Sequence, residues 1–522
     1  MRKLRIAVIE LVVKAPTRWV FGRIMNANQA SIMPQVIAHW CEQEGHDVEF
    51  ICYTGLENLF EELPTHADLV FIGAYTQAGQ LSYAISNLMR SRGAVTVLGG
   101  PHARCYPQDA LKYFDYVLGF TDREVLRTVL RDCSRNRPVG VNISAKGQAL
   151  DLPGVRERWK FIKIVLQKAP LIKGVSMIGS LGCPYTCSFC IDSVVPYQQL
   201  SFDVIQDDLR FLLQKFKKPN VGWHDPNFGI RFDEYLDAIE EAVPPGSINF
   251  FAESSLSLLS EPNLKRLRKN GFKAVLPGIE SWHDMGNKSK TGSKRGIDKV
   301  HLISEHVNMV LHYIPYIQTN FVLGLDVDDG PEPFELTKRF IDLAPGAFPA
   351  ISLLTAFGQA APLNLEYQKA GRVLPFPFHF MNNNHVMNVS PKNYSWPEFY
   401  DHLVDLQSCA FSRQTIVRRF KAGKKTRPRW LPWVNVLRAV CSEGFGRIKY
   451  YTALRQMLES DRQIRRFWEG ETAEIPPFYV DWMKRDLGAF WKWLPEGALY
   501  HDTNAYLKSE MQTKQVENTA HV

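Results

Sequence analysis

Three cysteines within eight residues are the strongest chemical feature of the 522-residue chain. Cys183, Cys187 and Cys190 follow the pattern Cys-x3-Cys-x2-Cys, directly after the apolar run 175–181. Thiolates at this spacing can bind three irons of a 4Fe–4S cluster from one loop and leave the fourth iron without a cysteine. A zinc ribbon would need a second cysteine pair at short spacing, and none follows. The pattern predicts one iron–sulfur cluster with an open position.

The segment 183–190 resembles the signature of the radical S-adenosylmethionine superfamily. The resemblance implies that the amino and carboxylate groups of S-adenosylmethionine bind the open iron. It also implies that Phe189 lies near the adenine, although shielding of the cluster is an equally physical role. Chance clustering of three thiols is the alternative interpretation, and the position after a predicted strand disfavours it.

The composition is that of a folded protein with two or three domains. Hydrophobic residues make up 45% of the chain and charged residues 22%, and the net charge is +8. Only three of the nine cysteines cluster, which favours a reducing compartment over a disulfide framework. No apolar run approaches the roughly 20 residues that span a bilayer. We therefore expect a cytoplasmic protein, with peripheral contact at the inner face of the membrane as an open alternative.

Residues 1–140 are predicted to form a Rossmann-like domain. Short β-branched runs alternate with helical patterns, which indicates a parallel sheet. The expected strands are 4–11, 47–53, 69–74, 95–98 and 115–118, and the expected helices are 30–44, 81–92 and 122–133. Ligands of such sheets bind at the carboxyl ends of the strands, where three loops fall: 75–79, 99–103 and 119–122.

The loop 98–103 together with 114–117 resembles the cobalamin-binding domain found ahead of many radical S-adenosylmethionine enzymes. The resemblance implies five cobalamin contacts: Thr76, Gln77, Gly99, Gly100 and His102. The two glycines would let the backbone approach a flat corrin ring. The Asp-x-His-x-x-Gly motif of the methionine-synthase type is absent, as it is from many class B radical methyltransferases, and a Gly-Phe-Thr-Asp turn follows the last strand. An ordinary αβ domain with a solvated His102 is the alternative.

Residues 141–170 are expected to be a connector, and residues 171–390 a partial (β/α)6 barrel. Ser201 can cap a helix that runs to residue 217. The expected strands are the run into the cysteines, 221–224, 248–252, 272–276, 316–323 and 350–354. Six βα units suggest an open barrel, which is the fold that the superfamily resemblance implies, with the chemistry at the carboxyl ends of the strands.

Polar residues at those strand ends are the candidates for binding S-adenosylmethionine. They are Glu253, Ser254, Gly278, Glu280, Ser281 and Asn320. Residues 278–281 resemble the Gly-Ile-Glu-Ser segment with which the family contacts S-adenosylmethionine. An ionised carboxylate could accept hydrogen bonds from the ribose or the ammonium group. For each acidic residue alone, a helix cap or a solvated strand end is the alternative.

Residues 391–510 are predicted to be a helical domain, and residues 511–522 a flexible tail. A basic cluster at 418–429 precedes Trp430, Trp433 and the apolar residues 434–440. A solvated basic face beside a packed helix is the more ordinary interpretation. Contact of the segment 418–440 with an anionic membrane surface is the alternative. No nucleic-acid partner is expected, because no RNA-binding module is recognisable.

These features predict an enzyme that cleaves S-adenosylmethionine reductively and, with cobalamin, methylates an unactivated carbon of a small-molecule or lipid-like substrate. The expected cofactors are a 4Fe–4S cluster, S-adenosylmethionine and cobalamin, with flavodoxin or ferredoxin as electron donor. A radical cyclase, rearrangement or carbon–carbon coupling enzyme is the nearest alternative, in which cobalamin is absent or donates no methyl group. A cobalamin or cluster sensor without turnover is the non-enzyme alternative.

Overall fold

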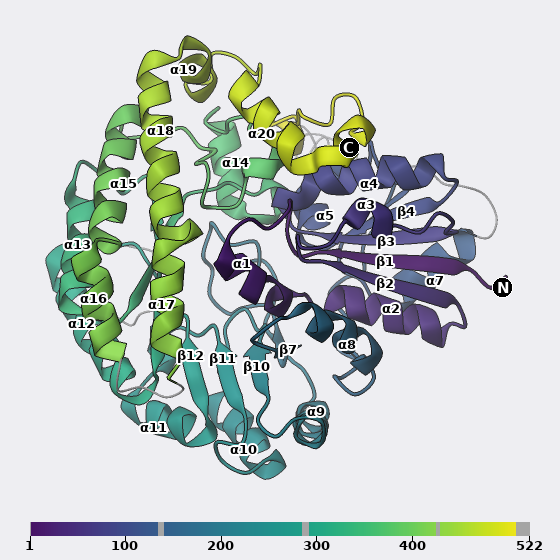
Figure 1. Ribbon diagram of the computed structural model, residues 1–522, viewed down its shortest axis with the longest axis horizontal. Coiled ribbons are helices and arrows are strands. Elements are labelled where there is room, and N and C mark those ends of the chain that lie inside the picture. The colour runs from purple at the N-terminus through teal and green to yellow at the C-terminus, as the bar shows by residue number, and fades with distance from the viewer. Residues whose placement is uncertain (1, 134–139, 284–291, 424–428, 508–522) are drawn as a thin grey trace, which may run out of the picture.

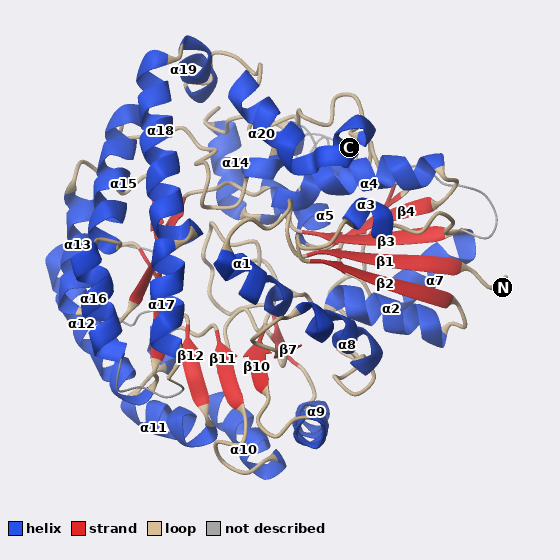
Figure 2. Cartoon of the chain, viewed as in Figure 1, coloured by secondary structure: helices blue, strands red, loops and turns tan. Residues whose placement is uncertain are grey.

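The computed structural model describes residues 2–133, 140–283, 292–423 and 429–507. The tail predicted at 511–522 and part of the basic cluster, Lys424, Lys425 and Arg427, lie outside these ranges. The strands form two separate parallel sheets, and helices cover both, as Figures 1 and 2 show. The predicted mixed α/β class is confirmed, with a helical C-terminal region.

The first sheet has six parallel strands in the order β2-β1-β3-β4-β5-β6. Its strands are β1 (Arg5–Leu11), β2 (Asp47–Tyr53), β3 (Leu69–Ala74), β4 (Val95–Gly99), β5 (Tyr116–Leu118) and β6 (Val141–Ile143). Its helices are α1 (Val20–Met25), α2 (Met33–Gln43), α3 (Leu59–Glu62), α4 (Gly79–Ser91), α5 (Pro101–Cys105), α6 (Pro107–Ala110), α7 (Arg123–Asp132) and α8 (Trp159–Lys168). Strand β6 pairs with β5 from within the segment predicted as a connector.

Alternate side chains of β1 pack into two different hydrophobic cores. Ala7 and Ile9 belong to the core that contains α4, whereas Ile6 and Val8 belong to the core that contains α2 and α7. Because successive side chains of a strand point to opposite faces, an apolar strand of this kind must be covered on both sides. The order β2-β1-β3 also reverses the direction of winding between β1 and β3, which creates the switch point where such sheets bind ligands.

The second sheet is an open parallel barrel. Its strands are β7 (Gly174–Met177), β10 (Asn220–Trp223), β11 (Asn249–Ala252), β12 (Phe272–Val275), β13 (Gly278–Glu280), β14 (Tyr316–Leu323) and β15 (Phe348–Leu353). Its helices are α9 (Phe202–Lys215), α10 (Phe232–Ala242), α11 (Glu261–Asn270), α12 (Gly296–Tyr313), α13 (Glu332–Leu343) and α14 (Pro362–Lys369). Strands β12 and β13 pair in succession with β14, so they act as one interrupted strand. Ser201 precedes α9 but its side chain makes no cap hydrogen bond, contrary to the prediction.

The barrel interior is not filled by side chains. Along β14 the residues under the helices are buried, whereas Gln318, Asn320 and Val322 are only half-buried. The same alternation occurs along β10 and β11. In a closed eight-stranded barrel such positions form a packed core. Here the same positions are only partly buried, unlike those of a closed barrel.

Helices α15 (Trp396–Ala410), α16 (Arg413–Gly423), α17 (Leu431–Val440), α18 (Arg447–Ser460), α19 (Arg462–Trp468) and α20 (Pro477–Leu487) form the C-terminal region. Helix α15 begins with a capping box between Ser395 and Glu398. The chain then returns to the first sheet, where Asn87 of α4 donates a hydrogen bond to the carbonyl of Trp493 at 2.9 Å. This return is visible in Figure 1. Among the described residues, no helix is long and apolar enough to cross a membrane.

Candidate functional site

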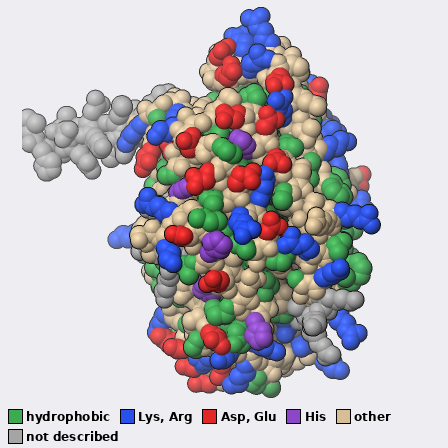
Figure 3. Space-filling view, turned by 90° about the vertical axis from the view of Figure 1, so that its left-hand side faces the viewer, with side chains coloured by type: hydrophobic (Ala, Val, Ile, Leu, Met, Phe, Trp, Pro, Cys, Tyr) green, Lys and Arg blue, Asp and Glu red, His purple; other side chains and the backbone are tan. Residues whose placement is uncertain are grey.

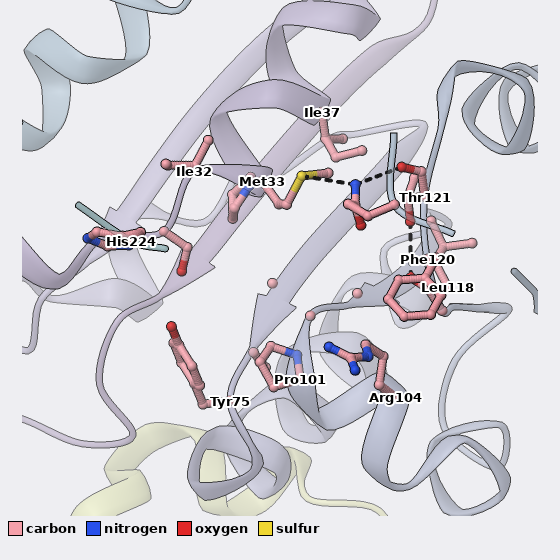
Figure 4. Close-up of a pocket in the computed structure, with 18 of the residues that line it drawn as sticks. Ile32, Met33, Ile37, Tyr75, Pro101, Arg104, Leu118, Phe120, Thr121 and His224 are labelled. Carbon is pink, nitrogen blue, oxygen red and sulfur yellow. Dashed lines mark hydrogen bonds between the residues drawn. The ribbon is translucent and has the colours of Figure 1, made fainter. Parts of the chain in front are cut away.

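A cavity of about 300 Å³ lies at the switch point of the first sheet. The carboxyl ends of β1, β3, β4 and β5 border it, together with the start of α2. Figure 4 shows Ile32, Met33 and Ile37 of this region on one side and Tyr75, Pro101 and Phe120 on the other. The wall is therefore mainly apolar, as expected for a site that binds a large organic group with few polar contacts.

Glycines keep one side of the cavity open. A Cβ atom added at Gly99 would meet no atom within 4 Å. Gly100 has a φ angle of +91°, and a Cβ there would lie 3.0 Å from the carbonyl oxygen of Ala74. Gly100 is thus required by the turn, because L-residues rarely adopt this conformation. Gly99 leaves free space that a flat ring could fill, so the residues present fit the corrin ring that the sequence predicted.

The other three predicted cobalamin contacts lie elsewhere. Thr76 is buried, and Gln77 accepts a hydrogen bond from Asn382 at 3.2 Å. His102 is fully buried, its Nε2 atom lies 2.8 Å from the Tyr83 hydroxyl, and its ring packs against Phe378. Burial lowers the pKa of His102 to about 3. His102 is therefore packed in the core rather than solvated, and it does not line the switch-point cavity.

Other residues, several of them from the predicted loops 75–79 and 119–122, take the lining positions. Tyr75 is 42% exposed within the cavity, and Phe120 and Thr121 follow β5. Gln148 donates to the carbonyl of Thr121 at 2.9 Å and closes the side next to α2. His224 enters from the barrel, and burial lowers its pKa to about 4, so the ring is neutral at pH 7. When an apolar residue follows a strand, the sequence alone does not show whether it lines a cavity or packs in the hydrophobic core.

The cysteine loop is closed by a short antiparallel pair. Strands β8 (Ser180–Leu181) and β9 (Gln198–Gln199) pair on either side of residues 182–197. Gly182 has a φ angle of +66°, and a Cβ there would lie 2.3 Å from the carbonyl oxygen of Pro196. Only glycine fits this close approach at the neck of the loop. The neck fixes the path of the loop before the first cysteine.

Asp225, at the carboxyl end of β10, anchors the entry to this loop. Its carboxylate accepts hydrogen bonds from the Gly179 amide at 3.0 Å, from the Ser180 hydroxyl at 2.5 Å, and from the Tyr235 hydroxyl. Burial raises the pKa of Asp225, while these donors lower it. Farther along the loop, the Tyr185 hydroxyl lies 2.8 Å from the Ser257 hydroxyl. The loop is therefore held by the second and third barrel strands.

The three cysteines are thiols rather than disulfides, with Cys183 buried and Cys187 and Cys190 half-buried. Phe189 beside them is also half-buried. Within the described ranges, no three His, Cys, Asp or Glu side chains could hold one metal ion between them. A cubane cluster takes each thiolate on a different iron, so its cysteines need not converge on one point. The donor set and its loop therefore fit a cluster better than a mononuclear metal.

Arg104 of α5 joins the cavity to the cysteine loop. Its guanidinium group lines the cavity and donates to the Asp192 carboxylate at 3.2 Å and to the Ile191 carbonyl at 2.9 Å. These two residues directly follow Cys190. The guanidinium group also lies over the Phe120 ring, 4.8 Å from its centroid. Leu181, Gly182, Asp192 and Val195 of the loop region line the same cavity.

Comparisons with known proteins agree with this arrangement, although no family model matches the chain. The bacteriochlorophyllide d C-12(1)-methyltransferase of Chlorobaculum tepidum is 24% identical over 389 residues, which cover 71% of this chain and 80% of that protein. The C-8(2)-methyltransferase of the same organism is 24% identical over 349 residues, covering 62% and 74%. The cobalamin-dependent S-adenosylmethionine radical enzyme OxsB, solved with aqua-cobalamin and S-adenosylmethionine, has a TM-score of 0.54 at 12% identity and covers all of this chain and 82% of its own.

The radical S-adenosylmethionine methyltransferase TsrM of Kitasatospora setae, solved with cobalamin and a 4Fe–4S cluster, has a TM-score of 0.50 at 15% identity, covering 70% of this chain and 78% of that one. The chain is thus similar in sequence to two methyltransferases, and in fold to cobalamin-dependent radical S-adenosylmethionine enzymes. The remaining predicted site residues lie at the carboxyl ends of the barrel strands.

Glu253 and Ser254 directly follow β11. The Glu253 carbonyl accepts the Phe228 amide at 2.7 Å, and the Ser254 hydroxyl donates to the Phe228 carbonyl at 3.0 Å. Ser254 is buried, whereas the Glu253 side chain is exposed. Ser254 thus holds two strand ends together, whereas the side chain of Glu253 lies at the surface.

Glu280 has a φ angle of +65° inside β13. A non-glycine residue in this region costs about 1–3 kcal/mol and is kept where the surroundings impose it, often at a functional site. The next residue, Ser281, accepts a hydrogen bond through its carbonyl from the buried Lys299 at 2.6 Å. The Glu280 side chain lies directly against Gly278, because a Cβ at Gly278 would be 2.1 Å from a Glu280 carboxylate oxygen.

Asn320 of β14 positions this segment. Its amide nitrogen lies 3.3 Å from the Leu276 carbonyl and 3.4 Å from the Pro277 carbonyl. Its amide oxygen accepts from Gln318 at 2.7 Å. These bonds bridge the interruption between β12 and β13, and so the side chain fixes the place of Gly278. The structure brings Asn320, Gly278, Glu280 and Ser281 into one strand pair.

Proposed function

We propose that this enzyme methylates an unactivated carbon, with a 4Fe–4S cluster on the three clustered cysteines and a cobalamin in the switch-point cavity. One observation carries the proposal: the two sites share a wall. The Gly99–Gly100 turn borders the cavity from the first sheet, and Leu181 and Gly182 border it from the neck of the cysteine loop. A group bound in the cavity would therefore face the loop that binds the cluster.

The chain's own residues support each part of this assignment. The apolar wall of the cavity excludes water from a bound ring, and Gly99 leaves room for it. Asp225 holds the chain just before the cysteine loop, and Arg104 holds the two residues after its third cysteine. When bound, the cluster supplies the electron that cleaves S-adenosylmethionine, and cobalamin supplies the methyl group.

Glu280 is the residue that we assign to S-adenosylmethionine. Its strained backbone fixes the carboxylate at the carboxyl end of the barrel, where an ionised acceptor can bind the ammonium or ribose hydroxyl groups. Ser281 and Gly278 complete the segment, and Glu253 and Phe189 are further proposed contacts. The half-buried lumen positions leave space for S-adenosylmethionine and a substrate between the barrel and the first sheet.

The substrate that we propose is a hydrophobic small molecule, of tetrapyrrole or lipid type, methylated at an sp3 carbon without an acidic proton. Hydrogen-atom abstraction reaches such carbons, whereas polar methyl transfer needs a nucleophile. The two sequence relatives are named for methylation of bacteriochlorophyllide d, which supports the tetrapyrrole class. An external one-electron donor of the flavodoxin or ferredoxin type is required, because the described chain carries a single cysteine cluster motif.

The test is anaerobic turnover with S-adenosylmethionine, methylcobalamin, a low-potential reductant and panels of tetrapyrroles and isoprenoid lipids. Methylation predicts a product heavier by one methylene unit, with 5′-deoxyadenosine and S-adenosylhomocysteine formed together. Formation of 5′-deoxyadenosine with an unmethylated, rearranged or cyclised product would replace methylation by the alternative radical reaction. A variant with serine at Cys183, Cys187 and Cys190 is the control, and it should form neither nucleoside.

A further inference from the structure

An apolar groove of about 610 Å³ lies between α1 and α17, away from the switch-point cavity. Its lining comes from three separate parts of the chain: Phe21, Ile24 and Met25; Leu171, Ile172 and Asn220; and Trp430, Trp433, Val434, Val436, Leu437 and Val440. Nearly all of these side chains are apolar. Helices α1 and α17 lie next to each other in front of the barrel strands in Figure 1.

Large apolar side chains around this groove are exposed. Leu171 is 74% exposed, Trp433 62% and Phe445 53%, and Trp19 at the start of α1 is 49% exposed. Trp19 belongs to the same surface, since a Cβ at Gly446 would lie 3.4 Å from its ring. Single exposed apolar residues are ordinary, whereas a cluster built from distant segments marks an interaction surface.

Basic side chains surround the apolar cluster. Arg23 lies between groove residues of α1, Lys173 follows Ile172, and Arg429 precedes Trp430. Lys421 follows Phe420, whose ring lies 4.8 Å from the Trp433 ring. All four of these basic residues are exposed. The nearby acidic residue Glu443 is paired with Arg438 at 2.5 Å, so the rim carries positive charge.

The described surface over helices α12, α13, α15 and α16 has no such apolar groove with a basic rim in Figure 3. Figure 3 shows acidic and basic side chains interspersed there, with hydrophobic side chains scattered among them. Such a mixed surface is typical of a face in contact with water. The apolar groove with its basic rim therefore gives the molecule one distinct face.

We propose that this groove face is the surface on which the protein docks to an anionic lipid bilayer. Trp433, Trp19 and Leu171 would insert at the level of the headgroups, where amphipathic rings and aliphatic side chains are favoured. The basic rim would lie against the negative headgroups. The surface combines Lys421 and residues 429–440 with two further segments, α1 and 171–173. The docking is independent of which carbon the enzyme methylates.

The charge of the rim argues for a bilayer over a second copy of this chain. In a twofold dimer the same patch meets itself, which would bring two basic rims together and cost electrostatic energy. An anionic bilayer offers the complementary charge across a flat area. The groove and its rim thus fit the bilayer in both hydrophobicity and charge.

The test is sedimentation of the full-length protein with vesicles of phosphatidylcholine alone and with one quarter phosphatidylglycerol. We expect binding to the anionic vesicles, weakened by salt, and a loss of about tenfold or more in partitioning for Trp433→Glu and for Leu171→Glu. Leu150→Glu is the matched control, because Leu150 is an exposed leucine (48%) of the first region and should leave binding unchanged.

Circular dichroism should show that these exposed substitutions leave the fold intact, and 5′-deoxyadenosine formation without substrate should stay at the wild-type rate. Equal partitioning of wild type and of both groove variants would overturn the proposal. So would a dimer in sedimentation velocity that Trp433→Glu dissociates, combined with no vesicle binding. Failure of methylation with intact vesicle binding would count against the proposed reaction and leave the docking surface standing.

Discussion

Arg104 and Asp192 form an ion pair, 3.2 Å between Nη1 and Oδ1, that connects the switch-point cavity to the residue two places after the third cysteine. The Asp192 amide in turn lies 3.5 Å from the Cys190 sulfur. One side chain of the first sheet thus contacts the cavity and fixes the end of the cysteine loop. The two sites depend on each other through this contact.

Replacement of Arg104 by alanine should lower both iron and corrinoid content after anaerobic reconstitution. The ion pair is partly exposed, so its loss should change the free energy of unfolding by no more than about 1 kcal/mol. The measurement is metal analysis together with the visible spectrum. Arg372→Ala is the matched control, because Arg372 forms a similarly exposed pair with Asp326 at 2.8 Å. A variant Arg104→Ala with wild-type cofactor content would contradict the coupling.

Replacement of Gly99 by valine should fill the cavity without disturbing the fold. A Cβ at this position meets no atom within 4 Å, and the φ angle of Gly99 is ordinary. We expect cobalamin affinity to fall at least tenfold, measured by titration followed at the corrin absorbance, with the melting temperature nearly unchanged. Gly147→Val is the control, since it also adds a side chain in open space but lies outside the cavity lining. Unchanged affinity in Gly99→Val would place the cobalamin elsewhere.

Replacement of Glu280 by glycine should weaken the binding of S-adenosylmethionine and leave the stability of the fold nearly unchanged. Relief of the positive φ angle offsets the extra chain entropy of glycine, so stability should stay within about 1 kcal/mol of wild type or rise. S-adenosylmethionine affinity, measured by calorimetry on the reconstituted protein, should fall tenfold or more. Asn383→Gly tests the backbone alone, because Asn383 has a φ angle of +61°. A strong loss of stability without a loss of affinity would make Glu280 a structural residue.

Glu10 should make stability depend on pH. Burial raises the pKa of this carboxyl to about 8, and its main counteracting contact is the Ser31 amide. A raised folded-state pKa favours the neutral acid, so the contribution to stability is complete below the ordinary pKa of 4.5 and is lost as the pH rises through 8. The slope is at most about 1.4 kcal/mol per pH unit. Denaturant unfolding of Glu10→Gln between pH 5 and 9 should be flatter than wild type; parallel curves would exclude this role.

The positions of most strands could be predicted from the sequence, because both sheets are parallel and their strands are buried. The predicted ranges 47–53, 69–74 and 316–323 have the same bounds as β2, β3 and β14. Strands β6 and β9 were missed, since two or three residues carry no period and their pairing is set by distant contacts. Strand β8 was predicted only as the end of the single run 175–181. Residues 278–281 were predicted as the end of the fourth barrel strand and not as the separate strand β13, whose pairing with β14 follows the interruption at Pro277.

The site was readable only where chemistry restricts the residue type. Cysteine spacing and the Gly99–Gly100 turn are such restrictions, and both residues of the turn line the cavity. Burial does not restrict the residue type in this way. His102 has the residue type of a ligand, yet tertiary packing places it in the core beside Tyr83. Tyr75 has the residue type of a core residue, yet it projects into the cavity, as Figure 4 shows.

We propose that one chain binds a cluster on its cysteine loop and a cobalamin in the adjoining switch-point cavity. Metal and corrinoid analysis of anaerobically reconstituted protein tests it most directly. We expect about four irons and one cobalt per chain. Iron should be lost in the triple cysteine-to-serine variant, and cobalt should be lost in Gly99→Val. Full iron with no cobalt bound at any tested concentration, or cluster-dependent 5′-deoxyadenosine formation that survives in the triple cysteine variant, would contradict it.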